Sequence, residues 1–173
     1  GGCQVTRSQQ DSALNNTSSI ASQNTTMSAY QHSDAHFDQV MECVRATMAP
    51  FDIQVTTDDP GPSVPHFEVM VAGTSQELNP NIDGAGGIAP FINCDANRNS
   101  VLSFVFSNMT SSITYLCTAI VHEAGHTYGL SHTLHAEDPM SYKDLGAYAK
   151  EWQNADQTCG IEDSSPQRCS CFN

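Results

Sequence analysis

The histidine spacing within residues 122–132 places strict demands on how this chain folds. The stretch reads His-Glu-Ala-Gly-His-Thr-Tyr-Gly-Leu-Ser-His. His122 and His126 are four positions apart, so on a helix both imidazoles leave the same face one turn apart. Gly129 stands where a helix commonly ends in a residue with positive φ, and a reversal there brings His132 back toward the pair. The spacing therefore predicts a helix that ends near Gly129 and three imidazoles that converge.

Three converging imidazoles are a typical ligand set for a catalytic zinc ion. Two nitrogens one turn apart can reach one ion at about 2.0–2.1 Å, and His132 supplies the third. The fourth tetrahedral position then stays open for water, whereas a structural zinc site fills it with protein. His135 is a candidate fourth ligand, but we interpret it as a histidine of a solvent-facing loop.

Glu123 is predicted to act as general base and acid at this metal. It emerges about 100° around the helix from His122, close enough to touch a metal-bound water without ligating the ion. Zinc lowers the pKa of its water to around 7 and polarises a scissile carbonyl. Glu123 can then take the water proton and deliver it to the leaving amine. Because only neutral imidazoles bind metal, affinity is expected to fall as the pH drops through the imidazole range.

The pattern His-Glu-x-x-His-x-x-Gly-x-x-His over residues 122–132 resembles the extended zinc signature of the metzincin metallopeptidases, with every fixed position filled. Residues 138–142, Asp-Pro-Met-Ser-Tyr, follow at a distance that suits the methionine turn of that family. The resemblance implies that Met140 forms an apolar floor beneath the metal and that Tyr142 stabilises the oxyanion. Thr133, after the third histidine, is not the residue of astacins, adamalysins or matrix metalloproteinases at that position, so the subfamily stays open.

Apolar periodicity predicts an α+β fold. Apolar residues recur at spacings of three and four over residues 34–48, which indicates a helix capped by Ser33 and stopped by Pro50. Two further helices are predicted at 111–128 and 142–152, and strands at 51–57, 66–71 and 101–106.

The predicted domain organisation has two parts. Residues 1–30 are rich in Ser, Thr, Asn and Gln, which indicates a polar, loosely structured segment. The metzincin resemblance implies a two-lobed catalytic domain over residues 31–173, with a twisted mixed sheet, a zinc-binding helix and a C-terminal helix. Its upper lobe is expected to reach about residue 131, with 132–173 forming the lower lobe. An extended substrate is expected to pair with an edge strand at residues 100–107 or in the loop before them.

The chain has seven cysteines, an odd number, at positions 3, 43, 94, 117, 159, 169 and 171. This density in a small polar chain indicates an oxidising compartment, and hence a secreted protein. The favoured pairing is Cys94–Cys117, with Cys159 joined to Cys169 or Cys171 and Cys3 joined to Cys43. Alternatively, as in latent metzincins, the thiolate of Cys3 occupies the open metal position and the chain is a zymogen.

The composition and the charge limit the partners and cofactors that this chain is expected to bind. The net charge of −13 repels phosphate backbones, which argues against a nucleic-acid partner. No apolar run is long enough to cross a bilayer, so no membrane partner is expected. Asn79, Asn81 and Asp83 imitate the start of a calcium loop, but the twelfth position is Pro90, so a turn is favoured over a calcium site. We expect a monomeric endopeptidase acting on proteins or peptides; the alternative class is a non-catalytic zinc-containing binding module.

Overall fold

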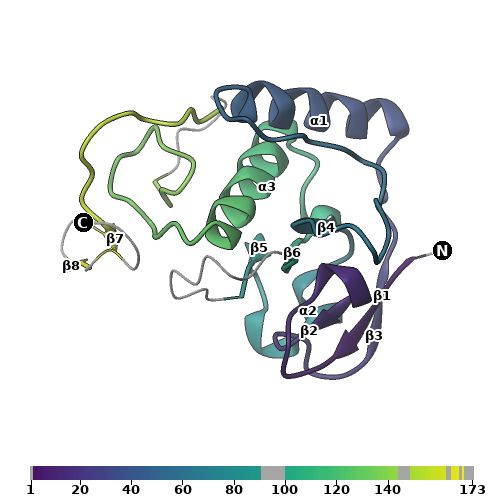
Figure 1. The fold of residues 1–173 in the computed structure, drawn as a ribbon. Helices are drawn as coiled ribbons and strands as arrows, with labels where there is room; N and C mark the ends of the chain where they lie inside the picture. Colours follow the sequence, from purple (N-terminus) through teal and green to yellow (C-terminus); the bar gives the residue numbers. More distant parts are fainter. Residues whose placement is uncertain (1, 91–99, 144–148, 163–164, 168, 170–173) are drawn as a thin grey trace.

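The computed structural model describes residues 2–90, 100–143, 149–162, 165–167 and 169, and its fold is α+β, as predicted (Figure 1). The helices of these residues are α1 (Asp34–Met48), α2 (Ser75–Leu78) and α3 (Ile113–Thr127), with 3-10 turns at Ala13–Asn15, Pro80–Ile82 and Ser107–Met109. The strands are β1 (Gly2–Arg7), β2 (Thr17–Ser18), β3 (Thr25–Ser28), β4 (Glu68–Val71), β5 (Gly87–Ile88), β6 (Leu102–Val105), β7 (Gly160–Glu162) and β8 (Ser165–Pro166). In this part of the chain, no helix has the length and apolar character needed to cross a membrane.

The first helix forms where its apolar pattern predicts. The Ser33 hydroxyl accepts a hydrogen bond from the backbone N–H of His36 at 3.2 Å, which satisfies one of the unpaired donors of the first turn. The helix ends at Met48, just before Pro50. Its apolar face is buried against α3, which runs beneath it in Figure 1, through the side chains of Val40, Met41, Val44 and Met48.

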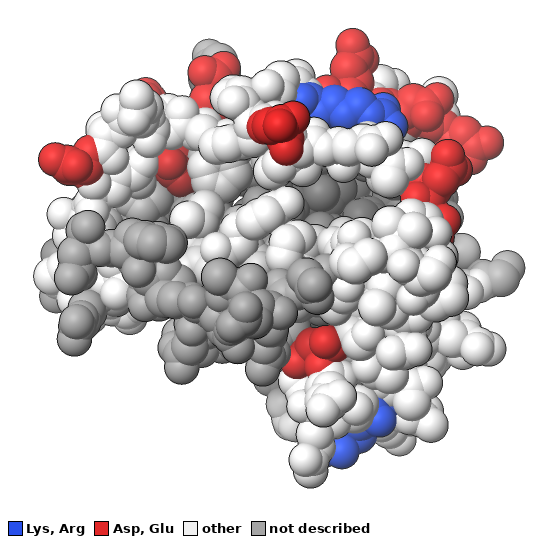
Figure 2. Space-filling view, in the orientation of Figure 1, with Lys and Arg blue, Asp and Glu red and all other residues white. Residues whose placement is uncertain are grey.

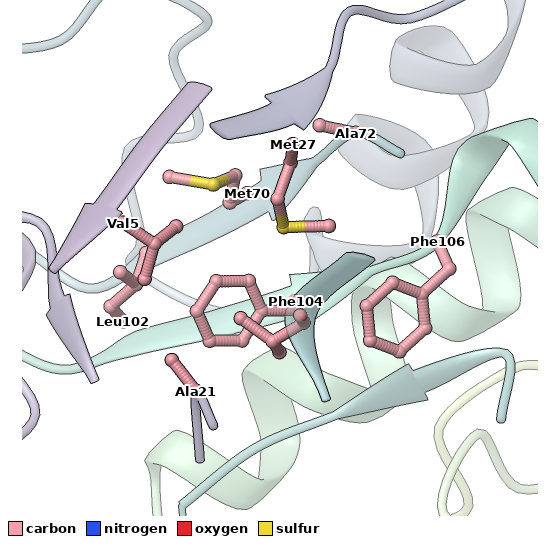
Figure 3. Close-up of a cluster of buried hydrophobic side chains, with 9 residues drawn as sticks. Val5, Ala21, Met27, Met70, Ala72, Leu102, Phe104 and Phe106 are labelled. Carbon is pink, nitrogen blue, oxygen red and sulfur yellow. The ribbon is translucent and has the colours of Figure 1, made fainter. Parts of the chain in front are cut away.

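The first thirty residues are not loosely structured. Strand β1 pairs with β2 on one side and β3 on the other. The few apolar side chains of this segment are spaced so that they reach the core: Val5 is 2% exposed and Met27 is 0% exposed. Both belong to one buried cluster with Leu102 and Phe104 of β6 (Figure 3). The polar composition did not predict this sheet, because a few apolar residues at the right positions are enough to pack it against the core.

The central sheet has the order β4-β6-β5, with β4 parallel and β5 antiparallel to β6. Strands β4 and β6 confirm the predictions for 66–71 and 101–106. The predicted strand at 51–57 is wrong, because that segment forms turns in which Phe51 N–H donates to Met48 and Ile53 N–H to Phe51. Its residues Ile53 and Val55 instead cover the cluster between α1 and α3. The alternation of apolar and polar residues correctly indicated that one side of this segment is buried. A segment can be half-buried in this way without pairing with a neighbouring strand.

The helix that carries the paired histidines also matches its prediction. The Ser112 hydroxyl caps it by accepting from the Tyr115 N–H at 3.2 Å. Beyond Thr127 the chain turns at Gly129, whose φ is +87°. The Leu130 N–H donates to the Gly125 carbonyl at 3.1 Å, so the reversal is fixed by backbone bonds. Of the predicted helix at 142–152, residues 144–148 lie outside the described part, and the described residues on either side are not helical.

Two disulfides are formed among the described cysteines, Cys43–Cys117 and Cys159–Cys169. The second confirms a prediction, whereas the predicted Cys94–Cys117 and Cys3–Cys43 pairs are wrong. The reason is tertiary: α1 lies directly on α3, which brings the Cα atoms of Cys43 and Cys117 to 5.9 Å. Cys3 carries a free thiol. Cys94 and Cys171 lie outside the described residues.

Candidate metal centre

The three predicted ligands converge at the C-terminal end of α3. The Nε2 atom of His126 lies 3.0 Å from that of His122 and 3.0 Å from that of His132. Two of these side chains come from the helix, and the third returns after the turn at Gly129. Within the described part of the chain, they form the one group of three or more His, Cys, Asp or Glu side chains whose ligand atoms all lie within 4.8 Å of one another.

Backbone carbonyls fix the tautomers of the two helical histidines. The Nδ1 atom of His122 lies 2.8 Å from the Pro139 oxygen, and the Nδ1 atom of His126 lies 2.8 Å from the Leu130 oxygen. A carbonyl oxygen can only accept, so each Nδ1 carries the proton and each Nε2 presents a lone pair. Two lone pairs facing each other at 3.0 Å repel unless a cation lies between them. The residues therefore fit a metal ion such as zinc, and the carbonyls supply the outer support that metal-binding histidines usually have.

The histidines are held in the neutral form that binds metal. Burial, and then the charge of neighbouring imidazoles, lowers the pKa of His122 to about 3 and that of His132 to about 4. Burial also lowers the pKa of His126. An exposed imidazole titrates near pH ~6.5. Protons therefore begin to compete with a metal at lower pH here than the ordinary imidazole range expected from the sequence.

Glu123 is buried beside this group and lies against the central sheet. Its side chain is 6% exposed. A Cβ atom on Gly87 of β5 would lie 2.6 Å from the Glu123 Oε1 atom, so a glycine is required there to make room for the carboxyl. Burial raises the pKa of Glu123 to about 8. A nearby cation would favour the ionised form, so this carboxyl can both accept and release a proton near neutral pH.

A cavity of about 490 Å³ opens beside His126, His132 and Glu123. One wall is β5, which within the described residues pairs with β6 alone. The predicted edge at 100–107 is therefore wrong, because β6 lies between β4 and β5. The alternative placed the edge in the loop before residue 100, of which residues 91–99 lie outside the described part of the chain. All four residues of β6 are buried, which is typical of a central strand and explains why Leu102, Phe104 and Val105 are apolar. The other lining residues include Ile82, Ala85, Ala89, Pro90, Leu130, Ser131, Tyr142 and Gln167.

The two residues carried over from the metzincin turn both lie at this site. Met140 is 2% exposed and occupies the space that a side chain on Gly125 would need, so its sulfur packs against α3 at Gly125, the residue before His126. The Tyr142 ring lies over the histidines, with its centroid 4.3 Å from that of His132 and 5.4 Å from that of His122. The turn therefore contacts the histidines through Tyr142 and packs against α3 through Met140.

Sequence reasoning missed the residue that holds this turn together. The Asp138 carboxylate is buried and accepts from the Met140 N–H at 2.8 Å and from the Gln157 amide at 2.9 Å. An aspartate whose side chain accepts from the backbone N–H two residues later commonly stabilises a turn. The Asp138-Pro139 pair in the sequence could have indicated this turn. Lys150, also missed, is buried and donates to the carbonyl of Ser141.

Other candidate ligands are not brought to the histidines. Cys3 lies in β1 opposite Met27, and partial burial, with a smaller contribution from the charge of Glu68, raises the pKa of its thiol. His135 is likewise outside the three-histidine group, but it is half-buried with its Nδ1 atom buried, so the interpretation as a solvent-facing residue is wrong. In the glycine-rich loop the Asn79 side chain caps a 3-10 turn by accepting from the Asn81 N–H at 3.0 Å. That bond is typical of the turn that the sequence favoured there.

Comparison with known proteins assigns no family. No family model, no curated protein and no solved structure matches this chain. The identity of the site residues and their geometry are therefore the basis for a functional proposal.

Proposed function

We propose that this chain is a zinc-dependent endopeptidase of the metzincin type, with His122, His126 and His132 holding the ion. One observation carries the proposal. Nε2 lone pairs, fixed by backbone carbonyls, face each other at 3.0 Å with the buried carboxyl of Glu123 beside them at a cavity. In the described part of the chain no fourth His, Cys, Asp or Glu joins the group. Three protein ligands with a general base are typical of catalytic zinc rather than structural zinc.

The chain's own residues have separable tasks in this reaction. A bound zinc ion would supply Lewis acidity, polarising the scissile carbonyl and lowering the pKa of a water. Glu123 accepts a proton from the attacking water and delivers it to the leaving amine. Partial burial and then the Glu123 charge raise the pKa of Tyr142, so its phenol stays protonated and can donate to the developing oxyanion. The edge of β5 offers backbone groups to an extended peptide.

The arrangement of the chain supports the two lobes of such an enzyme. In Figure 1 the central sheet lies on one side of α3, and the chain that follows α3 lies on the other. The upper lobe would contain α1, α3 and the sheets, and the lower lobe residues 132–173 with Met140. Two disulfides also fit a protein of an oxidising, extracellular compartment. Acidic side chains outnumber Lys and Arg on the face in Figure 2. Basic or neutral substrates would therefore be repelled less than acidic ones.

Digestion of a peptide library with and without a chelator tests this function. We expect the untreated chain to cleave library members, the chelated chain to lose cleavage, and added zinc to restore it. A sample of chelator already saturated with zinc controls for effects of the chelator itself. Hydrolysis that continues after the metal is removed would contradict the proposal. A chain that binds zinc but cleaves no peptide would instead favour a non-catalytic binding module, or a latent form that needs trimming.

A further inference from the structure

Strands β7 and β8 form a hairpin closed by a disulfide. Strand β7 pairs with β8, and the Cys159–Cys169 bond joins the two arms. The Gln167 N–H donates to the Cys159 carbonyl at 2.7 Å inside the same loop. Gln167 also lines the cavity beside the histidines. The hairpin is therefore part of the site wall, although it follows the last ligand by more than twenty-five residues in the sequence.

This hairpin also holds the backbone of the third ligand. The Gly160 N–H donates to the carbonyl of His132 itself at 3.0 Å. The next residue, Thr133, forms a β-bridge with Cys159, and the Leu134 N–H donates to the Thr158 carbonyl at 2.9 Å. His122 and His126 are placed by a continuous helix, but His132 lies in a segment without a helix or strand of its own. These bonds to residues 158–160 hold its backbone, together with the Thr133 N–H, which donates to the Met140 carbonyl at 3.2 Å.

We propose that the Cys159–Cys169 disulfide is a positioning element for His132, so that the affinity of the three-histidine site for its metal depends on this bond. The inference rests on the proposed metal site. Opening the hairpin would release residues 158–160, and the ligand would then have to be ordered by the metal at the cost of conformational entropy. Supports of metal ligands that lie outside the first coordination sphere typically contribute about 10–100-fold in affinity. The disulfide therefore stabilises the site without touching the ion.

The test compares zinc dissociation constants in competition with a chromophoric chelator. The double variant Cys159→Ser/Cys169→Ser is expected to bind zinc about tenfold more weakly than the wild-type chain, or worse. Cys3→Ser is the matched control, because it removes a thiol from β1 without touching the hairpin, and it is expected to bind as the wild type does. Equal affinity of the folded double variant and the wild type would overturn the inference. A wild-type chain that binds no zinc would instead refute the proposed function.

A measurement on the wild-type chain covers the case in which the double variant does not fold. Binding linkage is reciprocal, so a hairpin that supports the metal must itself be supported by the metal. Zinc is therefore expected to slow amide hydrogen exchange at Gly160 and Leu134. The Thr6 amide, which donates to Asn16 at 2.9 Å in the N-terminal sheet, is the internal control and should slow less. No slowing at Gly160 and Leu134, or slowing equal to that of Thr6, would overturn the inference.

Discussion

Replacing Glu123 by Gln is expected to lower the rate of peptide hydrolysis by about 10²–10⁴-fold while zinc stays bound. The amide has nearly the same shape as the carboxyl, so it fills the same space against Gly87. It cannot accept the proton of the attacking water. Because Glu123 does not belong to the ligand group, the dissociation constant for zinc should change little.

The control for this variant is Glu42→Gln, the same change at an exposed position of α1. Both variants are assayed by kcat/KM on a peptide selected from the library and by zinc content of the purified chain. We expect Glu42→Gln to match the wild type in both. A Glu123→Gln variant that cleaves at the wild-type rate would show that this carboxyl is not the general base.

The second large effect is expected on metal binding when His126 is changed to Ala. This imidazole is at the centre of the group, because its Nε2 atom lies 3.0 Å from the Nε2 atoms of both His122 and His132. Its loss leaves only His122 and His132 as protein ligands of the ion. Zinc affinity should fall by more than the roughly 100-fold that the loss of an outer support can cost. Chelator competition measures the change.

His135→Ala is the matched control, because His135 lies three residues past His132 yet stays outside the ligand group. We expect this variant to keep the zinc affinity and the hydrolysis rate of the wild type. If it loses as much affinity as His126→Ala, the site has four protein ligands. The open position needed for a reacting water would then be filled, and the metal would be structural.

Helices α1 and α3 and the convergence of the three histidines could be predicted from the sequence because their signals are local. Ser33 and Ser112 cap α1 and α3, and the chain turns at Gly129, so the spacing of the histidines was enough to predict their geometry. Helical periodicity and caps depend on residues only a few positions apart, and no distant part of the chain had to be known.

What could not be predicted depends on contacts between distant segments. The packing of α1 on α3 decided which cysteine pairs with Cys117. The short strand at Gly87–Ile88 has almost no strand signal, and its place at the cavity follows from pairing with β6 and from the space that Glu123 needs. The bond from Gly160 to the His132 carbonyl likewise joins segments that have no shared pattern. Local patterns cannot report such tertiary pairings.

X-ray absorption spectroscopy of the zinc-loaded chain tests the central claim most directly, because it reads the ligand set of the ion. We predict three imidazole nitrogens at about 2.0–2.1 Å and one oxygen from water, with no sulfur. A sulfur at about 2.3 Å would place a cysteine such as Cys3 on the metal, and a fourth imidazole would mark a filled structural site. Either result would contradict an open catalytic centre at His122, His126 and His132.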